Sequence, residues 1–487
     1  MDRAKKITKN TIWVLTARGI DILSNLILMA IIARYLGVEG FGVFSVLMAI
    51  VWAISPFLIL GLPRILARDI AQNKNKINEL IGRAITLIGL AAIPFLVIIP
   101  LFVFMFKITP GNTVIILIIT LLLIITAITR TLSSILVAFE KMHYEAIVSL
   151  LLALTSLFFI GVVVCIDLGF IFIFVGLLIS NISSLVGYIF ISYRHFALIP
   201  KFGIEKDTLA YLVKESTPML TYQLLMQAHL YSGVFLLKLL SSNLDVGLFH
   251  APYRIINRLQ IIPLTAVVGM YPHLSQLAIS DKDRLRSTVL TVLKLTLFAS
   301  LPLTIFIFIF ADKITWLIFG EAFSRSTIAL QIQILGLTLL FLLSIFESLF
   351  VILKRQHQLI VVVGSGLFLS LILNIILAPR YGYVGASLIT LISGIVMFIV
   401  SVHMLSDFFE GYSLIKVMYR PILAASVTTF VLYVIPAFHN MVLASVGLLI
   451  IFILMLFILN AFSHKEILFM KAVGQKLRWN NITNSNI

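Results

Sequence analysis

The 487-residue sequence has few of the features that support covalent or redox chemistry. It contains one cysteine, Cys165, which excludes an intramolecular disulfide, a cysteine-based zinc site and an iron–sulfur cluster. It contains no Walker loop for ATP and no His-Glu-x-x-His zinc helix. It also has no extended polar loop to hold the carboxylates of a glycosyl-transfer enzyme. We therefore expect no enzymatic activity, no cofactor and no metal site.

Charged residues are scarce as well. They make up 11% of the chain, whereas hydrophobic residues make up 61%, and the mean hydropathy is +1.13. Apolar runs of about 20 residues, long enough to span about 30 Å of hydrocarbon as a helix, recur from end to end. The composition predicts an all-α polytopic membrane protein. The first apolar stretch carries internal charge and lacks a small-residue cleavage site, so we interpret it as a retained span.

The apolar runs predict about fourteen transmembrane helices. Their predicted ranges are 11–33, 41–61, 82–106, 112–137, 144–166, 168–192, 216–239, 246–270, 287–311, 327–352, 358–378, 383–405, 417–437 and 441–461. Lysine and arginine concentrate in alternate loops, as at Arg64 and Lys141, whereas the opposite loops hold few, such as Arg34. Because cytoplasmic loops are enriched in these residues, both termini are predicted to lie in the cytoplasm, in the inner or plasma membrane. The net charge of +16 then reflects topology and contact with membrane lipids, and no motif for nucleic acid is present.

Weak internal similarity divides the spans into two sets. The matching positions, in the same order in both halves, are Gly42 with Gly247, Phe44 with Phe249, His143 with His357, and Gly169 with Gly382. Six spans separate equivalent points, and this even number predicts a parallel repeat. We expect an N-terminal six-helix lobe at 1–200 and a C-terminal six-helix lobe at 201–410. Two additional transmembrane helices and a basic cytoplasmic tail are expected at 411–487.

Several short motifs resemble a known family of membrane proteins. They are Ala33-Arg34-Tyr35-Leu36-Gly37, Gly40-Phe41-Gly42, Gly61-Leu62-Pro63-Arg64, Arg68-Asp69-Ile70-Ala71 and Tyr381-Gly382-Tyr383-Val384-Gly385-Ala386. Together they resemble polysaccharide exporters, the Wzx-like flippases of lipid-linked oligosaccharides in the multidrug/oligosaccharidyl-lipid/polysaccharide flippase superfamily. The resemblance implies two six-helix lobes around a central cleft that opens alternately to each side. It also implies a lipid-tail groove at the two additional helices.

Polar residues on one face of the first span point to a functional interior. Arg18, Asp21 and Asn25 follow the spacing i, i+3, i+7, which places them on one side of a helix. A basic side chain at the centre of a bilayer costs about 2.5–3.5 kcal/mol on insertion scales. We therefore expect Arg18 to line water or contact protein, and Asp21 to orient Arg18 and limit its unpaired charge.

The eighth span carries a second basic group, with Arg254, Asn257 and Arg258 within two turns. Helix-length arithmetic places Arg258 at about the depth of Arg18 in a 30 Å core. Because the two spans belong to different predicted lobes, their guanidinium groups are expected to clamp a diphosphate, whose oxygens match the forked donors of arginine. A static ion-pair network between the lobes is the alternative.

Other polar residues within spans have two interpretations each. Gln223, Gln227 and His229 on the seventh span suit either sugar hydroxyl groups or interhelical hydrogen bonds. Arg130 is expected either at the mouth of the cleft or in a structural ion pair. Glu347 is expected either to take up a coupling proton or cation, or to form a salt bridge.

Taken together, these features predict a flippase that works by alternating access. Its expected cargo is a polyprenyl-diphosphate-linked oligosaccharide, such as an O-antigen, capsule or exopolysaccharide unit, carried from the cytoplasmic to the outer leaflet. Expected partners are this lipid-linked glycan, membrane lipids, and the glycan polymerase and glycosyltransferases of the same pathway. The alternatives are a multidrug or cation antiporter of the same superfamily, a lipid II-type flippase and, from another class, a membrane-embedded glycan polymerase or ligase. The basic balance of the buried charges favours an anionic cargo.

Overall fold

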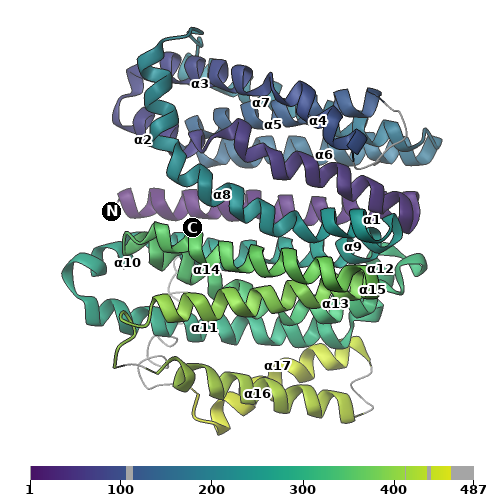
Figure 1. Cartoon of the computed structure of the whole chain (residues 1–487). Helices are drawn as coiled ribbons and strands as arrows, with labels where there is room; N and C mark the ends of the chain where they lie inside the picture. The colour runs from purple at the N-terminus through teal and green to yellow at the C-terminus, as the bar shows by residue number, and fades with distance from the viewer. Residues whose placement is uncertain (1, 106–112, 412, 436–439, 462–487) are drawn as a thin grey trace, which may run out of the picture. The chain divides into compact units, whose positions relative to one another are not determined.

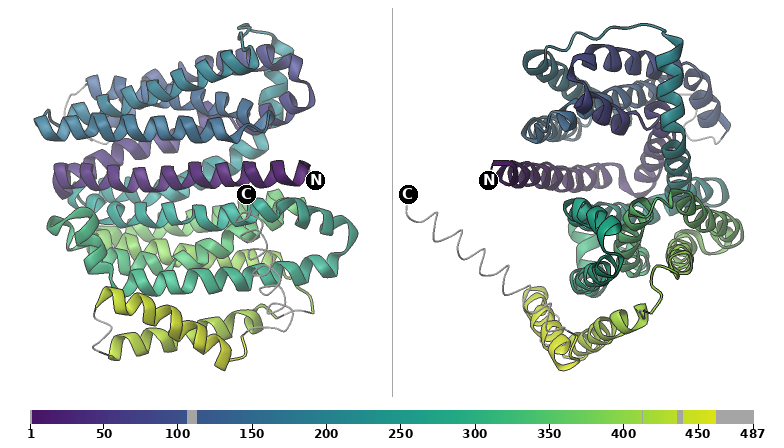
Figure 2. Two further views of the ribbon diagram at one scale, coloured as in Figure 1. Left: turned by 180° about the vertical axis from the view of Figure 1, so that it is seen from behind. Right: turned by 90° about the vertical axis from the view of Figure 1, so that its left-hand side faces the viewer.

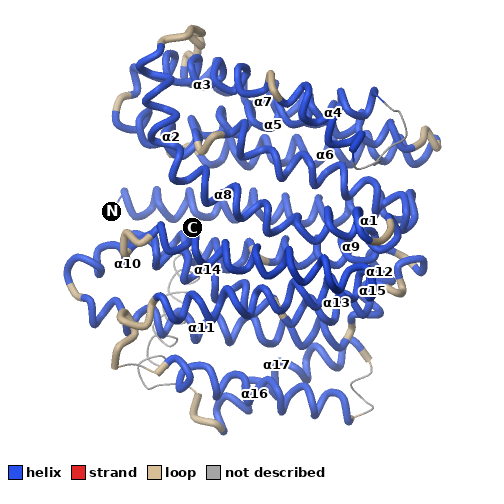
Figure 3. Tube along the Cα trace, viewed as in Figure 1, coloured by secondary structure: helices blue, strands red, loops and turns tan. Residues whose placement is uncertain are grey.

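The computed structural model describes residues 2–105, 113–411, 413–435 and 440–461 (Figure 1). These residues form α-helices, two short 3-10 helices and connecting loops, and no strand occurs among them (Figure 3). The α-helices are α1 (Asp2–Ile59), α2 (Leu62–Gln72), α3 (Ile77–Ala92), α4 (Phe95–Met105), α5 (Thr113–Ala138), α6 (Met142–Ile166), α7 (Phe170–Phe196), α8 (Lys206–Leu240), α9 (Asn243–Leu259), α10 (Ile261–Ser280), α11 (Lys282–Ile309), α12 (Ala311–Phe319), α13 (Ser326–Leu335), α14 (Leu337–Ile352), α15 (Gln356–Met404), α16 (Leu414–Val434) and α17 (Met441–Ile458). The 3-10 helices are η1 (Lys74–Lys76) and η2 (Glu321–Phe323).

Two of the helical stretches are too long for a single membrane crossing. Within the described ranges, nine stretches are long and apolar enough to cross a membrane. One of them, Thr16–Gln72, covers most of α1 together with α2 and has 57 residues. A straight helix of that length would measure about 85 Å, against about 30 Å of hydrocarbon. The chain leaves helical geometry at Gly37 (φ 66°, ψ −177°) in α1 and at Gly382 (φ 52°, ψ −132°) in α15. Each of these helices therefore contains two of the predicted spans. Figure 2 shows α1, in purple, from two further sides.

The remaining predicted spans also fall on helices. The third span corresponds to α3 and α4, and the eighth is divided between α9 and α10. The division follows from Pro263, which has no N–H to donate to the carbonyl of Leu259, where α9 ends. The fold class predicted from the sequence, an all-α polytopic membrane protein, is confirmed.

The first of two compact units comprises Met1–Ile261, Asp312–Gln333 and Gln356–Met397. Its core contains fully buried aromatic side chains, among them Phe41, Phe44 and Phe323. Phe41 packs against Phe44 at 5.9 Å between ring centroids and against Phe323, edge to face, at 5.8 Å. Residues from the start of α1's second crossing thus share one core with η2, far along the chain.

The second compact unit comprises Ile262–Ala311, Ile334–Arg355 and Phe398–Ile487. Within it, α11 packs against α14, α16 and α17. Its buried apolar cluster includes Ile305 of α11, Ala424 and Leu432 of α16, and Phe452 of α17. The lobes expected at 1–200 and 201–410, and the extra segment at 411–487, stay a prediction.

Two repeat-related glycines make matching contacts between α1 and α9. A Cβ atom on Gly42 would lie 1.9 Å from the carbonyl oxygen of Asn243. A Cβ atom on Gly247 would lie 2.1 Å from the carbonyl oxygen of Val38. The repeat alignment pairs Gly42 with Gly247 and Val38 with Asn243, so each contact is the counterpart of the other. The two backbones touch at a distance that only glycine permits.

Candidate functional site

A cavity of about 470 Å³ lies within the first unit, between α1, α5, α6, α7 and α9. Each helix contributes a stripe of residues at helical spacing, as expected for one face. The charged and polar lining residues are Arg18, Asp21, Ser24 and Asn25 of α1, Thr126, Thr129, Arg130 and Ser133 of α5, Glu145, Ser149 and Ser156 of α6, Asn181, Ser184 and Tyr188 of α7, and Arg254 and Arg258 of α9. Most of the charged residues singled out from the sequence therefore line one cavity.

Arg258 joins α9 to the polar face of α1. Its Nη1 donates to Oδ2 of Asp21 at 2.8 Å, and its Nε donates to Oδ1 of Asn25 at 3.1 Å. The sequence led us to expect that Asp21 orients Arg18 of its own helix, but the ion pair of Asp21 is made with Arg258. Helical periodicity identifies the residues that share a face, whereas the packing of α9 onto that face selects which arginine meets the carboxylate.

Arg254 contacts groups without formal charge. Its Nη1 lies 2.9 Å from the sulfur of Met29, and its Cζ lies 5.7 Å from the ring centroid of Phe44. Both partners belong to α1, on opposite sides of the break at Gly37. The aromatic face attracts the guanidinium through its quadrupole but does not neutralise it. Arg254 therefore brings a positive charge to the cavity wall.

Arg130 and Arg18 present further guanidinium groups to the same space. The Cζ of Arg130 lies 5.6 Å from the ring centroid of Trp52, and both arginine side chains are exposed to the cavity. In the part of the chain that the structure describes, no carboxylate forms an ion pair with Arg18, Arg130 or Arg254. The structural ion pair considered for Arg130 is thus not seen there.

Sequence reasoning missed an acidic residue of this cavity. Glu145 lies in the first turn of α6 and lines the cavity beside Tyr188. Its Oε2 is buried and has no hydrogen-bond partner among the described residues. The available signal was a carboxylate just inside the predicted span at 144–166. Trp52 and Asn181 were also missed, because neither carries a charge that is costly in a bilayer.

The polar side chains of α8 that the structure describes do not line this cavity. Gln227 donates from Nε2 to the carbonyl oxygen of Trp52 at 3.1 Å, which is an interhelical hydrogen bond from α8 to α1. Gln223 and His229 are half-buried on the same helix, and they are not among the lining residues. Asn257, on α9, is also outside the lining set. Among the three α8 residues, the described contacts favour one of the two interpretations only for Gln227, and it is the structural one.

Glu347 lies half-buried on α14 in the second unit and is not a lining residue of the cavity. Its assignment as a coupling residue stays a prediction.

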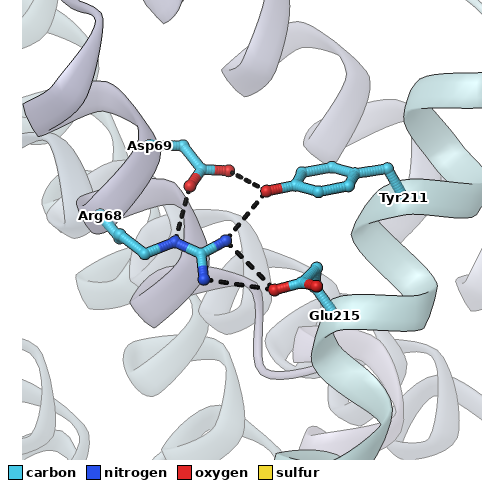
Figure 4. Close-up of polar contacts among 4 residues, drawn as sticks. All are labelled: Arg68, Asp69, Tyr211 and Glu215. Carbon is cyan, nitrogen blue, oxygen red and sulfur yellow. Dashed lines mark hydrogen bonds and ion pairs between the residues drawn. The ribbon is translucent and has the colours of Figure 1, made fainter.

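Two residues of a signature motif, Arg68 and Asp69, form a network with α8 (Figure 4). Arg68 Nε donates to Asp69 Oδ1 at 2.8 Å, and its Nη1 donates to Glu215 Oε2 at 3.2 Å. The hydroxyl of Tyr211 accepts from Arg68 Nη2 at 2.9 Å and donates to Asp69 Oδ2 at 3.0 Å. The network ties α2 to the first turns of α8 and lies outside the cavity.

Residues of the first signature motif also make structural contacts. Arg34 donates to the carbonyl oxygens of Leu317 at 2.6 Å and Ile318 at 3.2 Å, where α12 ends. The hydroxyl of Tyr35 donates to Asp167 Oδ1 at 2.6 Å and accepts from the backbone N–H of Gly169 at 2.9 Å. These contacts satisfy helix-end groups that have no partner within their own helix.

Solved structures with the same fold are transporters and flippases. A structure described as the lipid II flippase MurJ in an inward closed conformation has a TM-score of 0.69 and 16% identity, and covers 95% of this chain and 100% of that chain. An inward-facing multidrug resistance MATE family transporter of the MOP superfamily has a TM-score of 0.65 and 14% identity, with 83% and 100% covered. A MOP superfamily transporter from Pyrococcus furiosus has a TM-score of 0.57 and 16% identity, with 83% and 96% covered. At these identities the likeness establishes the fold.

The sequence of this chain also matches the model of a protein family. A comparison with curated proteins gave no match. Residues 7–278, more than half of the chain, match the model described as polysaccharide biosynthesis protein. This range includes every residue that lines the cavity. The chain belongs to the polysaccharide biosynthesis protein family.

Proposed function

We propose that this protein is a flippase for a polyprenyl-diphosphate-linked oligosaccharide. The observation that carries the proposal is the set of four arginines, Arg18, Arg130, Arg254 and Arg258, around one cavity. Among the residues that the structure describes, the cavity lining includes two carboxylates, Asp21 and Glu145, so the cavity is net positive when both are ionised.

The unpaired guanidinium groups favour an anionic cargo. A positive cavity with low-dielectric walls raises the local concentration of anions, because its field is poorly screened. Guanidinium groups also bind phosphate oxygens through paired, parallel hydrogen bonds. A diphosphate offers such oxygens at the point where the lipid and the glycan join. The head group would then occupy the cavity, while the polyprenyl tail stays in the lipid.

The same charge balance weighs against a cationic cargo. An antiporter for cationic drugs needs carboxylates that face the cargo, and here the arginines outnumber the carboxylates. The structure of the Pyrococcus furiosus transporter is described by a reverse polarity of its binding pocket that suggests a different function. Pocket polarity therefore varies among proteins of this fold. A static ion-pair network accounts for Asp21 and Arg258, but it does not account for Arg18, Arg130 and Arg254.

The contacts between α1 and α9 support an alternating-access mechanism. In the predicted topology, with both termini in the cytoplasm, Gly37 and the contacts at Gly42 and Gly247 lie at the outer side. The backbones meet there, whereas the cavity begins deeper along both helices. We infer that outward opening separates the glycine contacts. Glycosyltransferases and a glycan polymerase of the same pathway are the expected partners.

The experiment measures translocation of a lipid-linked oligosaccharide by purified protein in proteoliposomes. We expect Arg18→Ala and Arg254→Ala each to slow translocation by at least about tenfold, because each removes a charged contact worth about 1.5–3 kcal/mol. Arg284→Ala is the matched control, since it removes an exposed arginine at the start of α11, outside the cavity. Full translocation by both cavity variants would refute the proposal. A glycan that leaves the reaction with a changed mass would indicate a polymerase or ligase instead.

A further inference from the structure

The polar groups of the cavity divide into hydrogen-bond donors and acceptors. The arginines supply only donors. On α5, the hydroxyl of Thr126 donates to the carbonyl oxygen of Leu122 at 2.7 Å, and that of Thr129 donates to Ile125 at 2.7 Å. Because each hydroxyl has one proton, already given to its own helix, its lone pairs remain as acceptors.

Two neighbouring helices contribute acceptors of the same kind. On α7, Asn181 donates from Nδ2 to the carbonyl oxygen of Leu177 at 2.8 Å, which leaves its Oδ1 to accept and its second Nδ2 proton to donate. On α1, the hydroxyl of Ser24 donates to the carbonyl oxygen of Ile20 at 2.6 Å. All of these side chains line the cavity. We call Ser24, Thr126, Thr129 and Asn181 the acceptor wall.

The acceptor wall adjoins the arginines. Thr126 and Thr129 lie four residues and one residue before Arg130, on the same cavity-facing stripe of α5. Ser24 lies between Asp21 and Asn25, the two partners of Arg258. A ligand with a diphosphate on the guanidinium groups would therefore place the next chemical group against acceptors.

The hydroxyl groups of this wall do not hold the helices together. Each bonds to a carbonyl of its own helix, and the described hydrogen bonds show none of them reaching another helix. By contrast, Thr155 of α6 and Ser183 of α7, which are not lining residues, are 3.0 Å apart and link their helices. The polar character of the wall is thus not explained by helix packing.

We propose that the acceptor wall is the subsite for the first sugar of the cargo, and that this sugar is uncharged. This inference rests on the proposed function, because it takes the arginines as the diphosphate site. Sugar hydroxyl groups can donate to the lone pairs of Ser24, Thr126 and Thr129 and to Oδ1 of Asn181. A carboxylate on the sugar would instead face the lone pairs of three hydroxyl groups, and the second Nδ2 proton of Asn181 would replace only part of its lost hydration.

The test measures binding to purified protein in lipid nanodiscs. The probes are a polyprenyl diphosphate, the same lipid carrying one hexose, and the same lipid carrying one hexuronic acid. We expect the wild type to bind the hexose lipid more tightly than the bare diphosphate. The double variant Thr126→Val, Thr129→Val should bind the hexose lipid about tenfold more weakly, because two hydrogen bonds are lost, and the bare diphosphate unchanged. Thr120→Val is the matched control, since Thr120 is a buried threonine of α5, bonded to Ile116 in the same way, outside the cavity.

The outcomes separate the two proposals. Equal binding of both lipids by the wild type, or an equal loss of both in the double variant, would refute the subsite and leave the diphosphate site standing. Tighter binding of the hexuronic acid lipid would refute the uncharged sugar. Bare diphosphate that does not bind, or that binds equally to Arg18→Ala, would refute the proposed function itself. Thermal melting of the double variant at the wild-type temperature confirms that the fold is retained.

Discussion

Two of the contacts between α1 and α9 are built in opposite ways. At Gly42 and Gly247 their backbones touch, and a single added Cβ atom has no space. At Asp21 and Arg258 they meet through long side chains beside a cavity. Shape determines the first contact and charge determines the second. The comparison suggests that the glycine contact maintains a conformation, whereas the charged contact selects a ligand.

The motif residues of α1 make contacts that maintain the scaffold. Arg34 and Tyr35 satisfy helix ends, Gly37 breaks α1, and Gly42 permits the backbone contact. The cavity arginines lie outside these motifs. The motifs therefore identify the scaffold, and the residues that distinguish one cargo from another must be sought elsewhere in the sequence.

The internal repeat includes the glycine contact between α1 and α9 but not the charged contact. The glycine contacts obey the repeat, since Gly42 matches Gly247. The same alignment places Ala49 and Ala53 opposite Arg254 and Arg258. The contact is therefore symmetrical, whereas the part of α1 after Gly37 has no charged counterpart of Arg254 and Arg258.

The largest effect is expected at the glycine contact. Gly42→Leu places a side chain against the carbonyl of Asn243, which is backbone and cannot rotate away. We expect a loss of about 3 kcal/mol in the stability of this conformation, at the upper end for overpacking. The fall in melting temperature of the Gly42→Leu variant measures this loss of stability. Gly89→Leu is the control, because a Cβ atom there has no neighbour within 4 Å. Equal melting temperatures for the two variants would show that the backbone contact is not a constraint.

A smaller loss of stability, together with a gain in ligand binding, is expected at the charged contact. Asp21→Asn removes the carboxylate that pairs with Arg258 and leaves the guanidinium to a ligand. The side chains are 40% and 26% exposed, so the stability loss is expected to stay near 1 kcal/mol or below. We expect the variant to bind a polyprenyl diphosphate several-fold more tightly than the wild type, measured in nanodiscs. Weaker binding with a large drop in melting temperature would favour a static ion-pair network.

The smallest effect is expected at an exposed pair of the second unit, which serves as a baseline. Arg355 donates to Asp407 from Nη1 at 2.9 Å, and this interaction holds the pKa of the Asp407 carboxyl below its usual value. A lowered pKa in the folded state adds stability above the pKa of the unfolded chain, and this is lost as the pH falls through the folded value. Arg355→Gln should therefore cost less than about 1 kcal/mol at pH 7, and nothing at a pH where Asp407 is protonated. Thermal melting at both pH values tests this, and a pH-independent difference would contradict it.

The sequence by itself determined the membrane class, the helical spans and the presence of basic groups in the interior. These follow from composition, the length of apolar runs and the cost of charge in hydrocarbon, none of which requires knowing how the helices pack. It also determined that Arg18, Asp21 and Asn25 share a face, because helical periodicity is local.

Tertiary structure alone decided which faces meet. It paired Asp21 with Arg258 and placed Arg130 and Glu145 at the cavity. It also placed Nε2 of Gln227 within hydrogen-bond distance of the carbonyl oxygen of Trp52. The local sequence does not determine these contacts, because each depends on how one helix is rotated about its axis relative to another. That rotation is set by close packing, as at Gly42 and Gly247, where the absence of two side chains lets α1 and α9 approach.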